Sequence, residues 1–301
     1  MMTKVQRHNN GQLAYKQKYL AVLGPKNTYS DIAGTKYLQK MGRKDSVNAE
    51  KIYFNSIAAV FEAVEKGGAS AGIVPLENVI YGSVRETFDQ LFFRNVHISH
   101  KLKLKMRHAL VTLPTTKKKD INTIASHEQA IGQCSRYLEK YYPSAQKEYS
   151  TSTMAALEKM LSTHDGELAV IIPLESAMVL PVKILARNIE NSEKNFTTFV
   201  VIKKGAYEKT PKSTQSNVET AVAFYFHQDS PGCLYLVLRE FANAGINLSH
   251  IESRPSLNTP GTFIFFLNFE GAPSDHLVAK ILEDIKKYVA GMKILGVYSK
   301  I

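Results

Sequence analysis

The sequence is poor in cysteine and has no tryptophan, with Cys134 and Cys233 as the only thiols in 301 residues. Two cysteines are too few for a disulfide scaffold, and each falls inside an apolar helical pattern, which predicts buried free thiols in a reducing compartment. No apolar run reaches the length of a membrane span. The first 17 residues are polar and basic without a hydrophobic centre, unlike a secretory signal. We therefore expect a cytoplasmic protein in which residues 1–17 form a disordered basic tail.

The sequence also lacks a zinc-binding pattern, a phosphate loop and the motifs of nucleic-acid-binding proteins. The formal net charge is +11, but the basic residues are scattered. The one dense run, Lys117-Lys118-Lys119, follows a proline and two threonines, as in a solvated turn. A positive surplus of this kind is typical both of attraction of an anionic substrate and of greater solubility. We expect no metal, no nucleic acid and no membrane as partner.

Strands alternate with amphipathic helices through the first two thirds of the chain, which predicts an α/β fold. Residues 73–77 read Ile-Val-Pro-Leu-Glu and residues 171–175 read Ile-Ile-Pro-Leu-Glu, an internal echo that indicates two related lobes. Paired lobes would turn both strand ends toward a common cleft, the usual site for a small ligand. We expect lobe one at residues 18–95 plus 190–204 and lobe two at residues 96–189.

The segment that follows the first echo is the most informative stretch of the chain. Ser83 and Glu86 have the spacing of a capping box ahead of the apolar positions Phe88 and Leu91, which predicts a helix. The polar turn before it would lie at the carboxyl end of a parallel strand. Open α/β sheets bind small anions at this place.

A polar segment at residues 205–217, rich in Lys, Ser, Thr and Pro, predicts a linker. Residues 218–301 then follow the order strand, helix, strand, strand, helix, strand. This βαββαβ order predicts a ferredoxin-like module.

Several motifs in sequence order resemble those of prephenate dehydratase with a carboxy-terminal ACT regulatory domain. In the first part of the chain these are residues 24–30 (GPKNTYS), 75–89 (PLENVIYGSVRETFD), 126–134 (SHEQAIGQC) and 195–199 (NFTTF). In the last part they are residues 232–235 (GCLY), 246–248 (INL) and 252–255 (ESRP). The resemblance runs from about residue 18 to the end of the chain.

The resemblance implies a two-lobed, periplasmic-binding-protein-like α/β catalytic domain followed by a ferredoxin-like ACT domain. The implied activity is the decarboxylating dehydration of prephenate to phenylpyruvate without a cofactor, under feedback control by phenylalanine in a homodimer or homotetramer. Thr197 is the implied catalytic hydroxyl. The implied substrate-binding residues are Thr28, Ser30, Asn78, Ser83, Thr87 and Thr198. The implied phenylalanine-binding residues are Gly232, Cys233, Leu234, Asn247, Glu252, Ser253, Arg254 and Pro255. Helix capping alone is an alternative role for Thr28, Ser30 and Ser83.

The sequence departs from the family pattern at three single positions in the implied catalytic half, and the run at residues 171–177 also differs from the small-residue pattern usual there. Asn27 replaces a glycine, Val79 a serine and Thr198 an arginine that would suit a substrate carboxylate. Two alternatives stay open for this reason. In the first, the chain is a binding or regulatory paralogue with impaired turnover. In the second, it acts on arogenate, the amino analogue of prephenate, and a different group binds the substrate carboxylate.

Other cations would have to replace the missing arginine if the site is active. Arg85, Arg107 and Lys183 are candidates by position, each with a solvated surface charge as the simpler interpretation. His108 and His127 are candidates for proton transfer, with a structural role as the alternative for His127.

Overall fold

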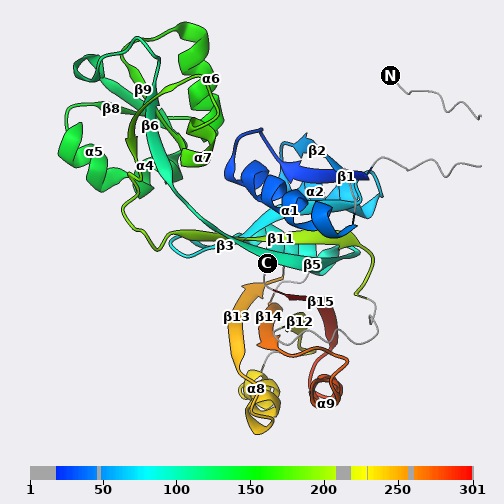
Figure 1. Cartoon of the computed structure of the whole chain (residues 1–301). Coiled ribbons are helices and arrows are strands. Elements are labelled where there is room, and N and C mark those ends of the chain that lie inside the picture. Colours follow the sequence, from blue (N-terminus) through cyan, green and yellow to red (C-terminus); the bar gives the residue numbers. More distant parts are fainter. Residues whose placement is uncertain (1–17, 46–48, 208–217, 229, 257–260, 300–301) are drawn as a thin grey trace, which may run out of the picture.

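The computed structural model describes residues 18–45, 49–207, 218–228, 230–256 and 261–299. The described chain forms two mixed sheets and is arranged as two lobes and a C-terminal module (Figure 1). The expected tail at residues 1–17 and most of the expected linker at residues 205–217 lie outside the described residues. None of the helices in the described ranges is long and apolar enough to cross a bilayer.

Lobe one is a mixed sheet with the strand order β5-β11-β3-β1-β2 and with β4 paired to β3. Its strands are β1 (Lys18–Leu23), β2 (Ala49–Phe54), β3 (Ala71–Asn78), β4 (Gly82–Ser83), β5 (Val96–Lys105) and β11 (Phe196–Lys204). Its helices are α1 (Tyr29–Asp45), α2 (Ile57–Glu65) and α3 (Arg85–Phe93). Residues of α1 pack with Leu20 and Val22, and residues of α2 pack with Ala21. Since successive strand residues face opposite sides, the two helices cover opposite faces of the sheet.

The boundary between the lobes differs from the expected one. Strand β5 was expected to open lobe two, but it pairs with β11 along its length and so belongs to lobe one. Ile98 and His100 pair with successive residues of β11, so Ser99 forms a bulge in β5. This bulge makes the alternation of apolar and polar residues in β5 hard to interpret from the sequence. The bulge shifts the alternation, so that Ile98 is buried in one core and Leu102 in the core on the other face.

Lobe two has a separate sheet with the strand order β10-β6-β9-β7-β8. Its strands are β6 (His108–Thr112), β7 (Thr123–Ser126), β8 (Gln146–Tyr149), β9 (Leu168–Pro173) and β10 (Lys183–Arg187). Its helices are α4 (Glu128–Gln133), α5 (Ser135–Tyr141), α6 (Thr153–Thr163) and α7 (Leu174–Ala177), with a 3₁₀ turn at Lys118–Asp120. All side chains of β9 are buried, because helices cover both faces of this strand.

The C-terminal module has the expected βαββαβ order, with its helices on one side of an antiparallel sheet (Figure 1). Its elements are β12 (Val218–Tyr225), α8 (Cys233–Asn243), β13 (Leu248–Pro255), β14 (Phe263–Glu270), α9 (His276–Ile285) and β15 (Gly291–Ser299). Phe224, Leu267 and Phe269 pack toward the helices. Ala223, Ile264 and Phe266 instead belong to the core of lobe one.

The helix-free face of the module sheet therefore lies on lobe one, chiefly on α3. Phe88 meets Phe266 edge-on with ring centroids 5.0 Å apart. Arg254 binds Asp89 in the middle of α3, with Nη1 2.9 Å from Oδ1, and it also donates to the carbonyl of Arg85 at the amino end of the helix. Lys293 Nζ donates to the carbonyl of Leu91 (2.7 Å) and to other carbonyls at the carboxyl end of α3. The module thus holds α3 at both ends.

A parallel bridge between Gly296 of β15 and Ile98 of β5 joins the module sheet to that of lobe one. The backbones approach so closely that a Cβ atom on Gly296 would lie 2.3 Å from the Ile98 carbonyl oxygen. Glycine is therefore required here by space, and this contact fixes the module against β5.

Candidate functional site

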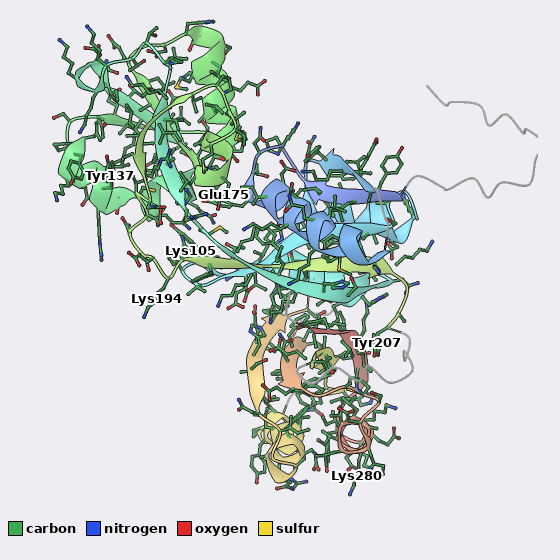
Figure 2. All side chains as sticks on the ribbon, viewed as in Figure 1. Lys105, Tyr137, Glu175, Lys194, Tyr207 and Lys280 are labelled. Carbon is green, nitrogen blue, oxygen red and sulfur yellow. The ribbon has the colours of Figure 1, made fainter. Side chains whose placement is uncertain are left out.

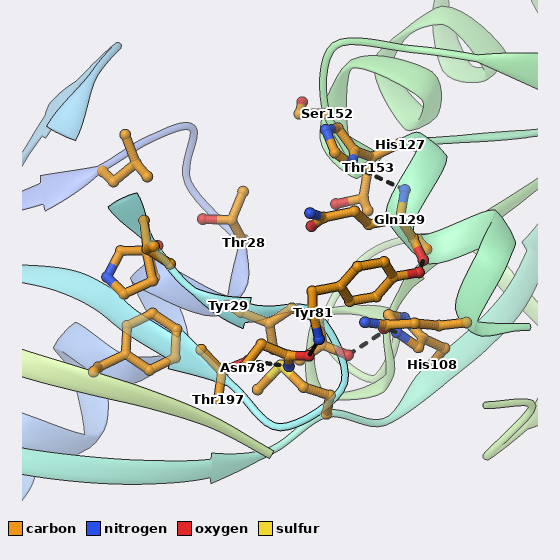
Figure 3. Close-up of a pocket in the computed structure, with 18 of the residues that line it drawn as sticks. Thr28, Tyr29, Asn78, Tyr81, His108, His127, Gln129, Ser152, Thr153 and Thr197 are labelled. Carbon is orange, nitrogen blue, oxygen red and sulfur yellow. Dashed lines mark hydrogen bonds between the residues drawn. The ribbon is translucent and has the colours of Figure 1, made fainter. Parts of the chain in front are cut away.

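A cavity of about 550 Å³ lies between the two lobes (Figure 3). Lobe one lines it with Thr28, Ser30, Asn78, Ser83 and Thr197, among others. Lobe two lines the opposite side with His108, His127, Gln129, Gln133, Ser152 and Thr153, among others. Leu23, Pro75, Met106 and Phe199 add apolar wall. The cavity is therefore a polar cleft with an apolar floor, a suitable site for a ring that carries oxygen substituents.

The structure brings together Thr28, Ser30, Asn78, Ser83 and Thr197 at this cavity, but not Thr87 or Thr198. Thr87 is fully buried, and its hydroxyl donates to the carbonyl of Pro75 at 2.7 Å. This hydrogen bond links helix α3 to strand β3. Thr198 lies between Thr197 and Phe199, which both line the cavity, and it does not line the cavity itself. Alternation along β11 turns its side chain to the other face.

Asn78 fixes the hydroxyl of Thr197. Its Oδ1 accepts from the backbone N–H groups of Ile80 and Tyr81, both at 3.0 Å, and this orients the amide. Its Nδ2 then donates to Thr197 Oγ1 at 2.8 Å. Because the Thr197 oxygen accepts this bond, its own proton is free to point into the cavity. Thr197 is only 8% exposed, so little water competes for that proton.

The expected capping box at Ser83 and Glu86 is wrong. Helix α3 begins at Arg85, and the residue at its cap, Val84, makes no side-chain capping bond. Ser83 instead pairs with Glu77 as part of the short hairpin strand β4, and its hydroxyl donates to Glu252 of the module. Glu86 caps a different helix, because its carboxylate accepts from the N–H of Ala58 in the first turn of α2 at 2.9 Å.

The second half of the internal echo does not reach the cavity. Strand β9 ends at Pro173 and the chain turns at once into α7, whereas β3 continues to Asn78 at the cavity wall. Helix α7 joins the lobes instead, because Ser176 donates its hydroxyl to the carbonyl of Asn27 at 2.6 Å. The expectation that both strand ends face the cleft holds for the first strand only.

The two histidines have different surroundings. Burial lowers the pKa of His108, and a hydrogen bond to Gln133 opposes that change, with Nε2 and Oε1 2.7 Å apart. His108 is therefore a neutral imidazole near neutral pH. Burial raises the pKa of the neighbouring Tyr29, whose hydroxyl donates to the carbonyl of Arg107 at 2.6 Å. His127 caps α4 by accepting from the N–H of Gln129 at 3.3 Å, and it also lines the cavity.

The described lining of the cavity contains no Lys, Arg, Asp or Glu side chain. Arg107 pairs with Glu175, Nη2 to Oε1 at 2.7 Å, and Glu175 lies on the side of lobe two that is nearest lobe one (Figure 2). Lys183 donates to the carbonyl of Thr116 at 3.0 Å, and Arg85 is exposed to solvent. None of the three cations considered as a replacement for the missing arginine lines the cavity. Among the described residues, no group of His, Cys, Asp and Glu is placed to hold a metal ion.

The amino ends of helices α1 and α6 supply partial positive charge instead. Residues Thr28 and Ser30 at the start of α1 line one side of the cavity, and Ser152 and Thr153 at the start of α6 line the other. The first N–H groups of a helix have no partner within it and attract anions. The cavity is thus suited to hold negative charge without a cation.

The departures from the family pattern do not disturb the cavity. Asn27 has φ 67°, a left-handed backbone that glycine adopts freely and that asparagine tolerates better than most residues. Val79 is 59% exposed and does not line the cavity. Together with the outward orientation of Thr198, all three replacements leave the described walls intact.

Some lining residues were missed by the sequence reasoning. Tyr81 spans the mouth of the cavity, and its hydroxyl donates to the carbonyl of Gln129 across the lobes at 3.3 Å (Figure 3). Nothing local in the sequence marks this contact. Ser152 was detectable, since its side chain caps α6 by accepting from Ala155 N–H at 3.0 Å and a serine before an apolar helical pattern is a cap signal.

The residues expected to bind an effector fall on two faces of the module. Gly232, Cys233 and Leu234 lie at the start of α8, and Asn247 is exposed just before β13. Ser253 pairs with Phe265 on the helix side of the sheet, and Pro255 lies two residues further along the same strand. Glu252 and Arg254 instead pair with Phe266 and Ile264, which face lobe one. Within one chain these eight residues therefore do not form one pocket.

The chain is similar to known proteins in both sequence and fold. A profile of the prephenate dehydratase family matches residues 20–207. The prephenate dehydratase of Methanocaldococcus jannaschii is 36% identical over 276 residues, which cover 91% of this chain and 95% of that protein. The bifunctional chorismate mutase/prephenate dehydratase of Aquifex aeolicus is 33% identical, over 95% of this chain and 74% of its own length. A crystal structure of prephenate dehydratase from Arthrobacter aurescens in complex with L-Phe is similar with a TM-score of 0.82 at 27% identity, covering 94% of this chain and 90% of that one. With a family profile over residues 20–207 and relatives of 33–36% identity over more than nine tenths of its length, this chain belongs to the prephenate dehydratase family.

Proposed function

We propose that this protein is a lyase that converts prephenate to phenylpyruvate, water and carbon dioxide. The observation that carries the proposal is the Thr197 hydroxyl, which Asn78 orients at 2.8 Å toward a cavity in a chain of this family. In the reaction the ring carboxylate leaves as carbon dioxide and its electron pair enters the ring. The ring hydroxyl departs from the opposite carbon, and one proton is consumed to make water.

Thr197 supports the departure of the ring hydroxyl. As the carbon–oxygen bond breaks, negative charge develops on the leaving oxygen, and a hydrogen bond from Thr197 becomes stronger than it is to the neutral hydroxyl. Only such a difference between transition state and ground state raises the rate. The low exposure of Thr197 supports this role, because its bond to the oxygen is not exchanged for one to bulk water.

The uncharged walls suit the two carboxylates of prephenate in different ways. A cation beside the ring carboxylate would stabilise the reactant against loss of neutral carbon dioxide, so its absence from the described lining favours decarboxylation. We assign the side-chain carboxylate to the helix ends at Thr28 and Ser152, with Ser30 as a further hydroxyl contact. This arrangement makes an arginine at position 198 unnecessary for anchoring.

The same walls argue against arogenate as the preferred substrate. Arogenate carries an ammonium group where prephenate has a keto group, and the described lining offers no carboxylate to bind it. The paralogue without turnover also loses its support, since it was motivated by Val79 and Thr198, which lie away from the cavity.

We assign the C-terminal module to the ACT class and the two lobes to the periplasmic-binding-protein-like class, and we propose that phenylalanine binds the module as a feedback inhibitor. The βαββαβ order and the left-handed Gly232 (φ 94°) before α8 support the first assignment. The L-Phe complex of the Arthrobacter relative supports phenylalanine as the effector. We further propose a homodimer or homotetramer in the cytoplasm, consistent with two free cysteines.

Purified protein given prephenate or arogenate tests the proposal. Phenylpyruvate formed from prephenate, in preference to phenylalanine formed from arogenate, is the expected result. Calorimetry with phenylalanine and light scattering test the effector and the oligomer separately. No product from either substrate, together with tight phenylalanine binding, would identify a regulatory paralogue and refute the enzymatic proposal.

A further inference from the structure

Strand β13 of the module presents every second side chain to the catalytic lobes. His250, Glu252 and Arg254 pair across the sheet with residues that face lobe one, and His250 stacks on Phe88 of α3 with ring centroids 5.7 Å apart. Glu252 reaches furthest toward the cavity, because its carboxylate accepts the hydroxyl proton of Ser83. Ser83 itself lines the cavity. One residue of the module is therefore a single hydrogen bond away from the substrate site.

The polarity of this hydrogen bond decides what Ser83 can offer. A carboxylate accepts hydrogen bonds and does not donate them, so the single proton of Ser83 is directed to Glu252. What remains toward the cavity is the serine oxygen, which is an acceptor. The described lining also lacks any cation that would offset the charge of Glu252. A dianion in the cavity would thus meet an acceptor backed by a negative charge.

Neighbouring charges do not cancel that of Glu252. Arg254 lies 4.0 Å from Glu252, Nε to Oε1, but its guanidinium is engaged by Asp89 at 2.9 Å and by the carbonyl of Arg85. His250 Nε2 lies 3.5 Å from Glu252 Oε2 and contributes charge only when it is protonated. The cluster of Glu252, Asp89 and Arg254 carries one excess negative charge when His250 is neutral.

We propose that Glu252 is a positioning residue of the catalytic site, through which the docked module lowers the affinity of the cavity for its dianionic substrate. Docking directs the Ser83 proton to Glu252 and leaves only the serine oxygen, an acceptor, toward the substrate. Undocking turns that proton into the cavity as a donor. The docked arrangement is then the inhibited form, and an effector that stabilises it inhibits by linkage, since substrate and docked module oppose each other. This inference rests on the proposed function.

The variant Glu252→Gln tests it, because the amide keeps the shape, loses the charge and can donate to Ser83. We expect KM for prephenate to fall by roughly three- to tenfold with kcat nearly unchanged, and the phenylalanine concentration for half-inhibition to rise by at least about threefold. Glu270→Gln is the matched control, since Glu270 is exposed at the end of β14 in the same module. It makes the same change of charge and should leave KM and inhibition unchanged.

A double-mutant cycle separates the path through Ser83 from a diffuse electrostatic effect. In a Ser83→Ala background, Glu252→Gln should change KM by less than about twofold, because the hydroxyl that Glu252 holds is gone. An unchanged or higher KM in Glu252→Gln, or the same fall in both backgrounds, would overturn the inference. A wild-type protein without turnover would refute the proposed function instead.

Discussion

Replacement of Thr197 by valine tests the core of the proposed chemistry. Valine has nearly the shape of threonine and also favours a strand, so the change removes the hydroxyl and little else. Asn78 Nδ2 loses one acceptor but keeps Asn195 Oδ1 at 3.0 Å and the Phe196 carbonyl at 3.1 Å. We therefore expect the free energy of unfolding to change by about 1 kcal/mol or less.

The expected loss of activity is much larger. Thr197 is nearly buried, and the described cavity walls hold no cation that could stabilise the leaving oxygen in its place. Removal of one preorganised donor from such a site costs about 10²- to 10³-fold in kcat, equivalent to roughly 3–4 kcal/mol of transition-state stabilisation. KM should change far less, because the bond to the neutral ring hydroxyl in the ground state is weak.

The assay is steady-state formation of phenylpyruvate from prephenate, with thermal unfolding to confirm the fold of each variant. Thr197→Ser keeps a hydroxyl and should retain activity within about tenfold. Thr198→Val is the matched control on the other face of β11, and we expect near-normal kcat. A Thr197→Val protein that keeps more than about a third of the wild-type kcat would refute the role of this hydroxyl.

Three further predictions follow from contacts of the described residues. Gly296→Val places side-chain atoms against the Ile98 carbonyl, where even a Cβ would lie at 2.3 Å, so phenylalanine inhibition should be lost and the module should become sensitive to protease while turnover persists. Burial lowers the pKa of His108, so the folded state takes up a proton at this residue less readily than the unfolded chain does. The free energy of unfolding should therefore fall as the pH drops below about 6.5. His108→Gln should make this pH dependence weaker in thermal-unfolding measurements. Tyr81→Phe removes the bond across the cavity mouth to Gln129, and we expect kcat/KM for prephenate to fall by less than about tenfold, since this is one partly exposed hydrogen bond.

The module was easier to predict from the sequence than the lobe boundary, for a physical reason. Its strands and helices follow one another with local turn signals, so the βαββαβ order could be predicted element by element. Strand β5 pairs with β11, about a hundred residues away, and a bulge at Ser99 interrupts its alternation. Neither the long-range pairing nor the bulge leaves a local trace in the sequence.

The site shows the same division. Asn78 and Thr197 belong to separate motifs, and their meeting at the cavity could be anticipated only from the family resemblance. The role of Ser83 could not be predicted, because its partner Glu252 is 169 residues away in the chain. The orientation of Thr198 was within reach, since neighbours on a strand face opposite sides and Thr197 was already placed at the site. Because of this alternation, a side chain at position 198 faces away from the cavity, so threonine in place of arginine there does not change the cavity wall.

The module covers one side of helix α3, and this contact makes the two parts of the chain depend on each other. Phe88, Leu91 and Phe92 pack beneath the module, and the carbonyl groups at the end of the helix are satisfied by Lys293. A shortened protein without the module would expose these apolar side chains to water, and the carbonyl groups would lose the donor that Lys293 supplies. One side of α3 therefore depends on the module for its apolar contacts and for part of its hydrogen bonding. A variant without the module would need polar replacements on one side of α3, and the residues just before this helix, Ser83 and Val84, line the cavity.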